Sequence, residues 1–324
     1  MSDLIGDDAA LQCLVISDGR RGIENQALGL AEACAALRPL KIETHHVPRG
    51  GVLSALPAKL SAKLTSLNLA ECDIAIGCGR RAIPTLLRLK RERPNVFTVY
   101  VQDPRLDPKA FDLVIAPEHD RVRGPNVITM IGSPNRVTKE RLEKEAQSFA
   151  DKISAYPKPR ALFLIGGKSK THHLSDADHM FHVKQAQDLL AKGYSLFITT
   201  SRRTPEKTKR AWRDFVKTQK TVWLYEGGDP NPYFAFLEAA NLILVTEDST
   251  NMLTEACVTE TPLYRLPMSG APGKFQILYE ALEIRCGVIR YQAGLAGQAY
   301  SPLTETKSAA QKLWDVYEKA ASLA

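Results

Sequence analysis

Residues 241–262, NLILVTEDSTNMLTEACVTETP, constrain the fold more than any other stretch of the chain. The apolar run Leu242–Val245 is short and lacks polar alternation, which is typical of a strand buried on both faces of a parallel sheet. A polar corner at residues 246–250 follows, and a helical pattern begins after it. A helix that starts at the carboxyl end of such a strand presents backbone N–H groups and a partial positive charge. Phosphates bind at this position in α/β folds.

The polar corner after this strand carries candidate residues for a nucleotide site. Ser249 and Thr250 are residue types that cap helices, and we expect them to lie beside a diphosphate. Glu255 follows within two helical turns, where its carboxylate can accept hydrogen bonds from both hydroxyls of a ribose. An ordinary βα unit with a capped helix is the alternative interpretation of the same pattern.

The spacing of the segment favours the nucleotide interpretation. Ser249, the dipeptide Glu255-Ala256 and the step Thr261-Pro262 resemble the nucleotide-sugar segment of two-domain (GT-B type) glycosyltransferases, notably lipid-A-disaccharide synthase. Two features depart from that pattern: Thr250 stands where a glycine is usual, and the acidic pair Glu247-Asp248 lies beside the proposed diphosphate. Those two carboxylates would repel a diphosphate unless they point away from it.

Composition is that of a soluble globular protein. The 324 residues suffice for two domains, and hydrophobic and charged fractions of 44% and 24% are ordinary. The six cysteines are scattered without a C-x-x-C pair, which favours buried thiols in a reducing compartment. The N-terminal residues are acidic and lack an apolar segment, so we expect neither a signal nor a transit peptide, and a cytoplasmic location. The net charge of +7 favours anionic partners such as nucleotides, acidic glycans or a phospholipid surface.

In the first half of the chain, polar clusters recur where predicted strands end. Asp18 lies in the corner 17–22, which contains two glycines and two arginines and follows a predicted strand at Leu11–Ser17. Asp103 and His119 come directly after later predicted strands. Because ligands of open α/β sheets bind at the carboxyl ends of strands, these three residues are our candidates for the base that deprotonates an acceptor hydroxyl. Solvated charges in ordinary turns are the alternative.

The second half of the chain repeats the pattern after a proline-containing linker at residues 155–160. Gly166-Gly167 follows one predicted strand, and Arg202-Arg203 follows another, just before a helix led by Pro205. A double-glycine corner allows close backbone approach, and two arginines at a strand end favour a bound anion. We therefore predict that the diphosphate is held by Gly166, Gly167, Arg202, Arg203, Ser249 and Thr250, and the ribose by Glu255.

Four histidines crowd residues 172–182 together with two aspartates. His179 and His182 would lie one helical turn apart, so a metal site is conceivable. Ser175 and Asp178, however, have the spacing of a helix capping box. Because only one credible ligand pair is present, we expect no metal, and no cofactor other than a nucleotide-sugar donor substrate.

A leucine stripe precedes the third predicted strand. Leu53, Leu56, Leu60, Leu64 and Leu67 recur at helical spacing, with Lys59 and Lys63 on the other face. Packing against a sheet is the favoured interpretation of such a stripe, and docking on an anionic membrane surface is the alternative. No apolar run approaches the length of a membrane span, so any contact with the inner membrane surface would be peripheral.

Six motifs occur along the chain: ISDGRRGIENQALGLAEA, VYVQDPR, APEHD, IGGKSK, TSRRTP and TEDSTNMLTEA. In combination they resemble the Elm-type mitochondrial-fission protein family, whose bacterial members are often labelled nucleoside-diphosphate-sugar epimerases. The resemblance extends from about Leu14 to Tyr291. It implies a GT-B-like fold, in which two Rossmann-like α/β domains face a cleft.

From these observations we expect an N-terminal acceptor-side domain at residues 1–155 and a nucleotide-sugar-binding domain at 156–300. A terminal helix at 301–324 would pack back on the first domain. The favoured function is a metal-independent glycosyltransferase-like enzyme that transfers a sugar to a lipid or envelope-glycan acceptor. A non-catalytic adaptor that binds protein or a membrane surface is the alternative. An epimerase or reductase, which rests only on the motif GCGRRA at 77–82, comes third. We expect no nucleic-acid partner.

Overall fold

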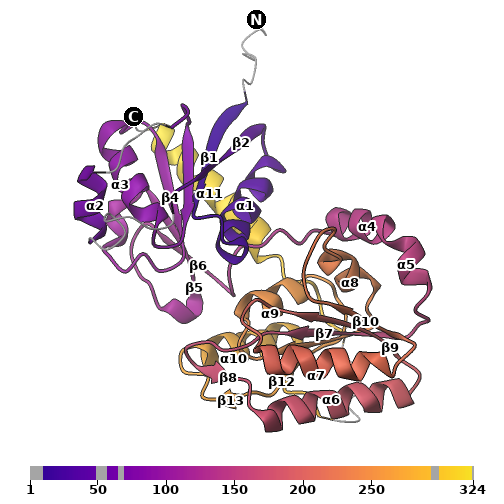
Figure 1. Ribbon diagram of the computed structural model, residues 1–324. Coiled ribbons are helices and arrows are strands. Elements are labelled where there is room, and N and C mark those ends of the chain that lie inside the picture. The colour runs from indigo at the N-terminus through magenta and orange to yellow at the C-terminus, as the bar shows by residue number, and fades with distance from the viewer. Residues whose placement is uncertain (1–9, 49–56, 65–68, 293–298, 323–324) are drawn as a thin grey trace, which may run out of the picture. The chain divides into compact units, whose positions relative to one another are not determined.

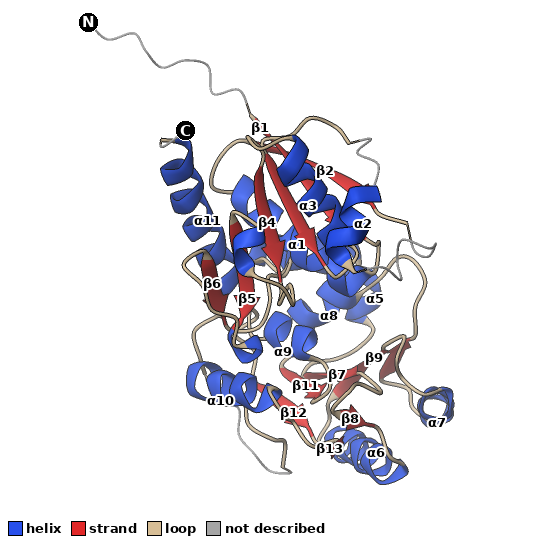
Figure 2. Ribbon diagram, turned by 90° about the vertical axis from the view of Figure 1, so that its left-hand side faces the viewer, coloured by secondary structure: helices blue, strands red, loops and turns tan. Residues whose placement is uncertain are grey.

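The computed structural model describes residues 10–48, 57–64, 69–292 and 299–322 (Figure 1). The chain divides into two compact units. Unit 1 comprises residues 1–136 and 304–324, and unit 2 comprises residues 137–303. Each unit has its own parallel sheet between helices, as the secondary-structure colours of Figure 2 show.

The sheet of unit 1 has six strands in the order β2-β1-β3-β4-β5-β6, and all neighbours are parallel. The order reverses between β1 and β3, and such a switch point places the corners after both strands beside each other. The strands are β1 (Leu11–Ser17), β2 (Leu40–His46), β3 (Ile74–Cys78), β4 (Phe97–Val101), β5 (Leu113–Pro117) and β6 (Val127–Met130).

Helices cover both faces of this sheet. One face packs against α1 (Arg21–Ala35) and α11 (Glu305–Ala321), which bury alanines, leucines and Trp314 on it. The other face packs against α2 (Ala58–Leu64) and α3 (Ala82–Glu92). Two short 3-10 turns, η2 (Pro108–Ala110) and η3 (Glu118–Asp120), flank β5.

The sheet of unit 2 has five parallel strands in the order β10-β9-β7-β11-β12. Here the order reverses between β7 and β11, so the corners after these strands form the second switch point. The strands are β7 (Arg160–Ile165), β9 (Ser195–Thr200), β10 (Val222–Tyr225), β11 (Leu242–Thr246) and β12 (Leu263–Leu266). A small antiparallel pair is formed by β8 (His172–His173) and β13 (Ser269–Gly270).

One face of this second sheet packs against α6 (Asp176–Ala191) and α7 (Glu206–Lys217), which bury Trp212. On the other face, Phe236 stacks on Phe197 with ring centroids 4.6 Å apart. Phe236 belongs to α8 (Tyr233–Ala239). The remaining helices of the unit are α4 (Lys139–Ser148), α5 (Ala150–Ser154), α9 (Thr250–Ala256) and α10 (Phe275–Cys286).

The division between the units differs from the boundary at residue 155 drawn from the sequence. Helices α4 and α5 belong to unit 2, because α4 packs on α8 and the Arg141 guanidinium lies 4.8 Å from the ring centre of Phe234. The linker at 155–160 is therefore an internal connection of unit 2. The C-terminal helix α11 belongs to unit 1, where it packs on α1.

Most predicted strands are confirmed to within a residue or two, including the buried run Leu242–Val245. Strand β2 and helix α10 were not predicted. The predicted capping box of Ser175 and Asp178 is confirmed at the start of α6.

The leucine stripe is described only in part. Leu53, Leu56 and Leu67 lie outside the described residues, and α2 covers the middle of the stripe. Leu60 is 46% exposed, and its neighbours Lys59 and Lys63 are exposed as well. This leucine therefore does not pack in the core. In the part of the chain that the structure describes, no helix is both long and apolar enough to cross a membrane.

The docking of α11 gives a stability prediction. Trp314 is 1% exposed, its indole N–H donates to the Cys34 carbonyl oxygen at 3.2 Å, and its ring packs edge-on against Tyr317. We expect Trp314→Ala to lower the free energy of unfolding of unit 1 by about 3–5 kcal/mol, because it leaves a large cavity in the core. Urea unfolding followed by circular dichroism measures this. The control Lys312→Ala, at an exposed position of the same helix, should change stability by less than about 0.5 kcal/mol. Equal unfolding midpoints for the two variants would contradict the prediction.

Candidate functional site

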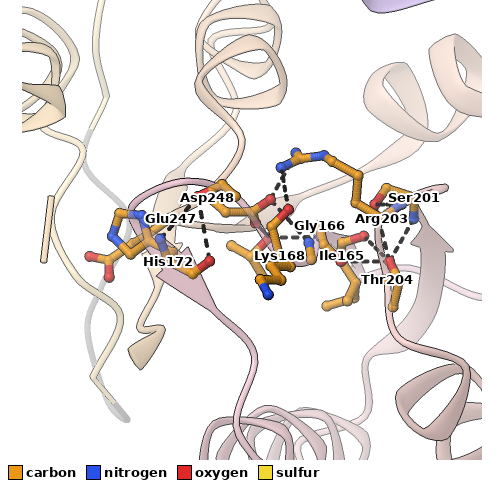
Figure 3. A network of polar contacts seen from close by, with 12 residues as sticks. Ile165, Gly166, Lys168, His172, Ser201, Arg203, Thr204, Glu247 and Asp248 are labelled. Carbon is orange, nitrogen blue, oxygen red and sulfur yellow. Dashed lines mark hydrogen bonds and ion pairs between the residues drawn. The ribbon is translucent and has the colours of Figure 1, made fainter. Parts of the chain in front are cut away.

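A buried carboxylate joins the strand ends at the switch point of unit 2 (Figure 3). The Asp248 side chain is 0% exposed. It accepts hydrogen bonds from the Gly167 N–H at 3.0 Å and from the Thr246 hydroxyl at 2.7 Å, and it pairs with the Arg203 guanidinium at 2.8 Å. These partners come from the corners after β7, β11 and β9, so one side chain connects three neighbouring strands.

The two glycines predicted to approach a phosphate make room for this network. A Cβ atom on Gly166 would lie 2.0 Å from an Asp248 carboxylate oxygen, and one on Gly167 would lie 2.0 Å from the Arg203 carbonyl oxygen. Both glycine amides also donate within the protein, that of Gly166 to the Thr246 hydroxyl at 2.7 Å and that of Gly167 to Asp248. The glycines are therefore needed for close packing inside the corner, and their N–H groups are engaged by protein oxygens.

The corner after β9 fixes the position of Arg203. The Thr204 hydroxyl donates to the Gly166 carbonyl oxygen at 2.5 Å and accepts from the Ser201 N–H at 2.9 Å, which ties this corner to β7. The Arg203 guanidinium donates to the Lys168 carbonyl oxygen at 3.2 Å in addition to its contact with Asp248. The Arg203 side chain is nonetheless 44% exposed. Arg202 precedes it on the same corner and is exposed.

Burial dominates the electrostatics of this network. It raises the pKa of Asp248, and the Arg203 charge, the Gly167 N–H and the Thr246 hydroxyl act in the opposite direction. A carboxylate without these partners would be strongly destabilising in such a position. The Asp248 carboxylate therefore holds the Arg203 guanidinium at the sheet edge, and the guanidinium compensates the charge of the buried carboxylate.

The neighbouring carboxylate points elsewhere. Glu247 is 1% exposed and pairs with Arg265 at 3.0 Å and with Arg290 at 2.7 Å, while it also accepts from the Met268 N–H at 3.2 Å. The two carboxylates that the sequence placed beside a diphosphate are each bound to arginine in the protein. Their charges are compensated internally, which removes most of the expected repulsion.

The remaining predicted residues of unit 2 lie on α9 and at its start. Ser249 is the N-cap and is 8% exposed, with no side-chain capping bond, and Thr250 is the first helical residue and is half-buried. Glu255 is half-buried on the following turn, where its carboxylate accepts from the Tyr233 hydroxyl at 2.5 Å. Burial raises the pKa of Glu255 to about 7, and the tyrosine hydrogen bond opposes the shift. Tyr233, on α8, was not foreseen from the sequence.

The three base candidates of unit 1 all lie after strands of one sheet edge. Asp18 follows β1 and its side chain is 3% exposed; both of its oxygens accept from Arg20, and Arg81 lies 3.9 Å away. Asp103 follows β4 and accepts from the Arg105 N–H at 2.8 Å, which closes its own loop. His119 lies in η3 after β5 and is 6% exposed. The three residues therefore lie at the same edge of the sheet. Asp18 and Asp103 are engaged by other groups of the protein, and His119 is buried.

A second polar group at this edge was missed by the sequence analysis. In it, the Ser17 hydroxyl donates to a Glu24 carboxylate oxygen at 2.8 Å, and His46 Nε2 lies 2.5 Å from the same oxygen. His46 was overlooked because strand β2 was not recognised. Alternation of Leu40 and Ile42 with polar residues was the available signal for that strand.

The histidines of residues 172–182 have separate partners. His172 Nδ1 contacts the Thr171 hydroxyl at 2.9 Å, and His182 Nε2 contacts the Pro267 carbonyl oxygen at 2.8 Å. His179 packs edge-on against Trp212. Burial lowers the pKa of His182 to about 4. Among the described residues, no group of three histidine, cysteine or acidic side chains is placed to hold a metal ion.

A sequence profile of the family described as mitochondrial fission ELM1 matches residues 21–317. The chain belongs to this family. The mitochondrial fission protein ELM1 of Arabidopsis thaliana is 29% identical over 273 residues, which cover 74% of this chain and 62% of that protein. The chain thus spans less than two thirds of its plant relative. A protein of Rickettsia prowazekii (strain Madrid E), named uncharacterized protein RP120, is 26% identical over 341 residues, with 92% of this chain and 96% of that protein covered.

Solved structures similar to this ELM1-family chain show the same fold at low sequence identity. The UDP-GlcNAc 2-epimerase from Methanocaldococcus jannaschii has a TM-score of 0.58 and 12% identity, with 95% of this chain and 99% of that chain covered. The UDP-GlcNAc 2-epimerase from Neisseria meningitidis has a TM-score of 0.53 and 11% identity, covering 95% and 94% of the two chains. The expected GT-B-like fold of two Rossmann-like domains is confirmed.

The raised pKa of Glu255 gives a pH prediction. Because its pKa rises from an ordinary 4.5 to about 7 on folding, its contribution to stability is complete below pH 4.5 and is lost as the pH rises through about 7. Relative to Glu255→Gln, the wild-type chain should lose on the order of 2–3 kcal/mol of unfolding free energy over that interval. Thermal unfolding of both proteins at pH 5 and pH 8 tests this. Glu238→Gln, at an exposed position of α8, is the control. Parallel pH profiles for wild type and Glu255→Gln would show that the carboxylate ionises normally.

Proposed function

We propose that unit 2 binds a nucleoside diphosphate sugar at the carboxyl ends of β7, β9 and β11. The observation that carries this proposal is that Arg203 is held in place at the switch point and is also exposed. Its guanidinium is fixed by Asp248 and by the Lys168 carbonyl oxygen, yet the side chain is 44% exposed. A positioned cation at the switch point of a parallel sheet is suited to an anionic ligand.

The proposed contacts follow from the positions of the side chains. Arg203 and the exposed Arg202 bind the diphosphate, beside Ser249 and Thr250 at the start of α9. Glu255 binds the ribose hydroxyls and exchanges its contact with Tyr233 for them. Gly166 and Gly167 act indirectly, because they allow Asp248 to reach and hold Arg203. A structure of the M. jannaschii epimerase, which shares the fold, was solved in complex with UDP-GlcNAc and UDP.

The proposed reaction is transfer of the sugar to a hydroxyl of a lipid or envelope-glycan acceptor. The acceptor oxygen bonds to the anomeric carbon while the bond from that carbon to the diphosphate oxygen breaks. Guanidinium groups already in position stabilise the negative charge that develops on the leaving diphosphate. A base takes up the proton of the acceptor hydroxyl.

Donor binding can be tested with a thermal-shift screen against UDP, GDP, CDP, dTDP and ADP sugars, followed by calorimetry. A ligand present at about 100 times its Kd should add about 2.7 kcal/mol of stability. We expect Arg203→Ala and Glu255→Ala each to weaken binding about 10- to 150-fold, which corresponds to about 1.5–3 kcal/mol for a lost charge-assisted hydrogen bond.

Because Arg203→Ala also leaves the buried Asp248 carboxylate without its cation, the double variant Arg203→Ala/Asp248→Asn is measured in parallel. It should fold more stably than the single variant and still bind weakly. Lys217→Ala, at the far end of α7 where the lysine is 74% exposed, is the control for a lost surface charge. Unchanged affinity in all of these variants would place the nucleotide site elsewhere.

A second candidate function is peripheral contact with an anionic membrane, which is compatible with an adaptor as well as with an enzyme that uses a lipid acceptor. The observation that favours it is the exposure of Leu60 between the exposed lysines Lys59 and Lys63 on α2. An exposed leucine flanked by lysines can insert at the lipid interface while the charges contact the head groups.

Co-sedimentation with vesicles containing an anionic lipid tests this second candidate. We expect pelleting at low ionic strength that is lost in Lys59→Glu/Lys63→Glu, because each basic residue contributes about 1 kcal/mol near an anionic surface. Lys307→Glu/Lys312→Glu, which reverses two exposed charges on α11 of the same unit, should still pellet. Pelleting that resists moderate salt and is weakened by Leu60→Ser would indicate insertion of the leucine. Absence of pelleting at low salt rules the membrane contact out.

A further inference from the structure

Positive charge is concentrated in two corners of unit 1 that its switch point brings together. The corners are residues 18–21 after β1 and residues 79–81 after β3, and they contain four arginines: Arg20, Arg21, Arg80 and Arg81. Three of the four are exposed, and the Arg81 side chain is 35% exposed. The two corners contain a single acidic residue, Asp18, so their net charge is +3.

The two corners pack against each other. Gly79 has a φ of +83°, and a Cβ atom on it would lie 2.8 Å from the Ile23 side chain in the first turn of α1. Gly19 has a φ of +68°, which lets the chain turn from β1 into α1. Glycine at position 79 therefore allows the corner after β3 to approach α1 closely, and the arginines of both corners lie at one part of the sheet edge.

Asp18 connects the two corners. Its carboxylate accepts from Nε of Arg20 at 2.8 Å, and Nη2 of Arg20 lies 2.7 Å from the same oxygen. Nε of Arg81 lies 3.9 Å from that oxygen. The Asp18 side chain is 3% exposed, so the two arginines compensate the charge of a buried carboxylate and are oriented by it.

Both guanidiniums are positioned and still accessible. Arg20 contacts Asp18 through Nε and Nη2, and Nη1 of Arg81 donates to the Pro48 carbonyl oxygen at 3.0 Å. A guanidinium has five N–H groups, so these contacts occupy only part of the donors. The Arg20 and Arg81 side chains are 49% and 35% exposed, which leaves room for a ligand to reach them.

Glu24 is the acidic side chain in the first turn of α1 that could oppose an anion at this edge. Its carboxylate accepts from the Ser17 hydroxyl at 2.8 Å and contacts His46 Nε2 at 2.5 Å. The Glu24 side chain is 20% exposed. Because other groups of the protein engage this carboxylate, it opposes a bound anion less than a free carboxylate would.

We propose that the corners after β1 and β3 form a binding site for a phosphate group. Arg20 and Arg81 bind the phosphate, and Asp18 is the positioning residue that orients them. A phosphate monoester carries close to two negative charges and three acceptor oxygens, which suit two guanidiniums and the surplus positive charge better than a single carboxylate does. The phosphate belongs to a soluble ester or to a lipid head group. The inference does not depend on the nucleotide site proposed for unit 2.

Calorimetry with inorganic pyrophosphate, which has two terminal phosphate groups, tests this site in the full chain. The parent protein is Arg203→Ala/Asp248→Asn, in which binding at the proposed site of unit 2 is weakened. We expect Arg20→Gln and Arg81→Gln in this parent each to weaken pyrophosphate binding about 10-fold. This is the lower end for a charge-assisted hydrogen bond, because both side chains are partly exposed. Arg91→Gln, at a 51% exposed position of α3, is the matched control and should leave binding unchanged.

Asp18→Asn separates positioning from net charge. The substitution removes a negative charge, so a patch that attracts anions by charge alone would bind pyrophosphate more tightly. Loss of the carboxylate also frees the two arginines, whose ordering then has to accompany binding. We expect the second effect to dominate and binding to weaken by about 3- to 10-fold. Tighter binding in Asp18→Asn would overturn its positioning role.

Vesicles of phosphatidylcholine with and without phosphatidate identify the source of the phosphate. Pelleting that requires phosphatidate and is lost in Arg20→Gln/Arg81→Gln assigns the site to a lipid head group. Pyrophosphate binding that depends on the two arginines, without such pelleting, assigns it to a soluble ester. Pyrophosphate binding that is absent from the parent, or equal in Arg20→Gln, Arg81→Gln and Arg91→Gln, overturns the site. A donor screen without a hit would remove the proposed function of unit 2 and leave these results unaffected.

Discussion

The edge of unit 2 depends on one buried carboxylate. Asp248 is removed from water and is stabilised only because an amide, a hydroxyl and a guanidinium from three strand ends reach it. Each of those contacts requires a particular neighbour: Gly166 has to lack a Cβ atom, and Thr204 has to bind its corner to β7. Loss of the Arg203 guanidinium would leave the buried carboxylate without its counter-charge, which is far more costly than loss of an exposed ion pair.

The acidic pair directly after β11 makes two separate sets of contacts. Glu247 and Asp248 both lie in the turn between β11 and α9, and their carboxylates pair with different arginines. Glu247 joins Arg265 and Arg290 and connects β11 to the segment after α10, while Asp248 connects β11 to β7 and β9. Two like charges adjacent in sequence therefore stabilise different halves of the same edge, and neither is left to oppose an anionic ligand.

The sequence was sufficient to predict most of the strands, their parallel arrangement and the polar corners at their carboxyl ends. Short β-branched runs identify buried parallel strands, and polar residues directly after them have to lie at the carboxyl edge. The partners of those polar residues could not be predicted, because they depend on strand order. Arg203 meets Asp248, and Ser17 meets His46, only once β7 lies between β9 and β11 and β2 lies beside β1. The same limitation misplaced the domain boundary, since the contact of Arg141 with Phe234 is not visible in local sequence.

The two units use the same device at their switch points. In unit 1 the buried Asp18 binds Arg20 and lies near Arg81, and in unit 2 the buried Asp248 binds Arg203. Each carboxylate offsets part of the positive charge of the arginine beside it. In return it holds that long side chain in one orientation. A guanidinium ordered in advance loses little entropy when it meets a ligand, and it retains donors for a second anion because it has five N–H groups. If the proposed anion site is correct, a buried aspartate would thus favour anions of matching geometry over strong attraction of any anion.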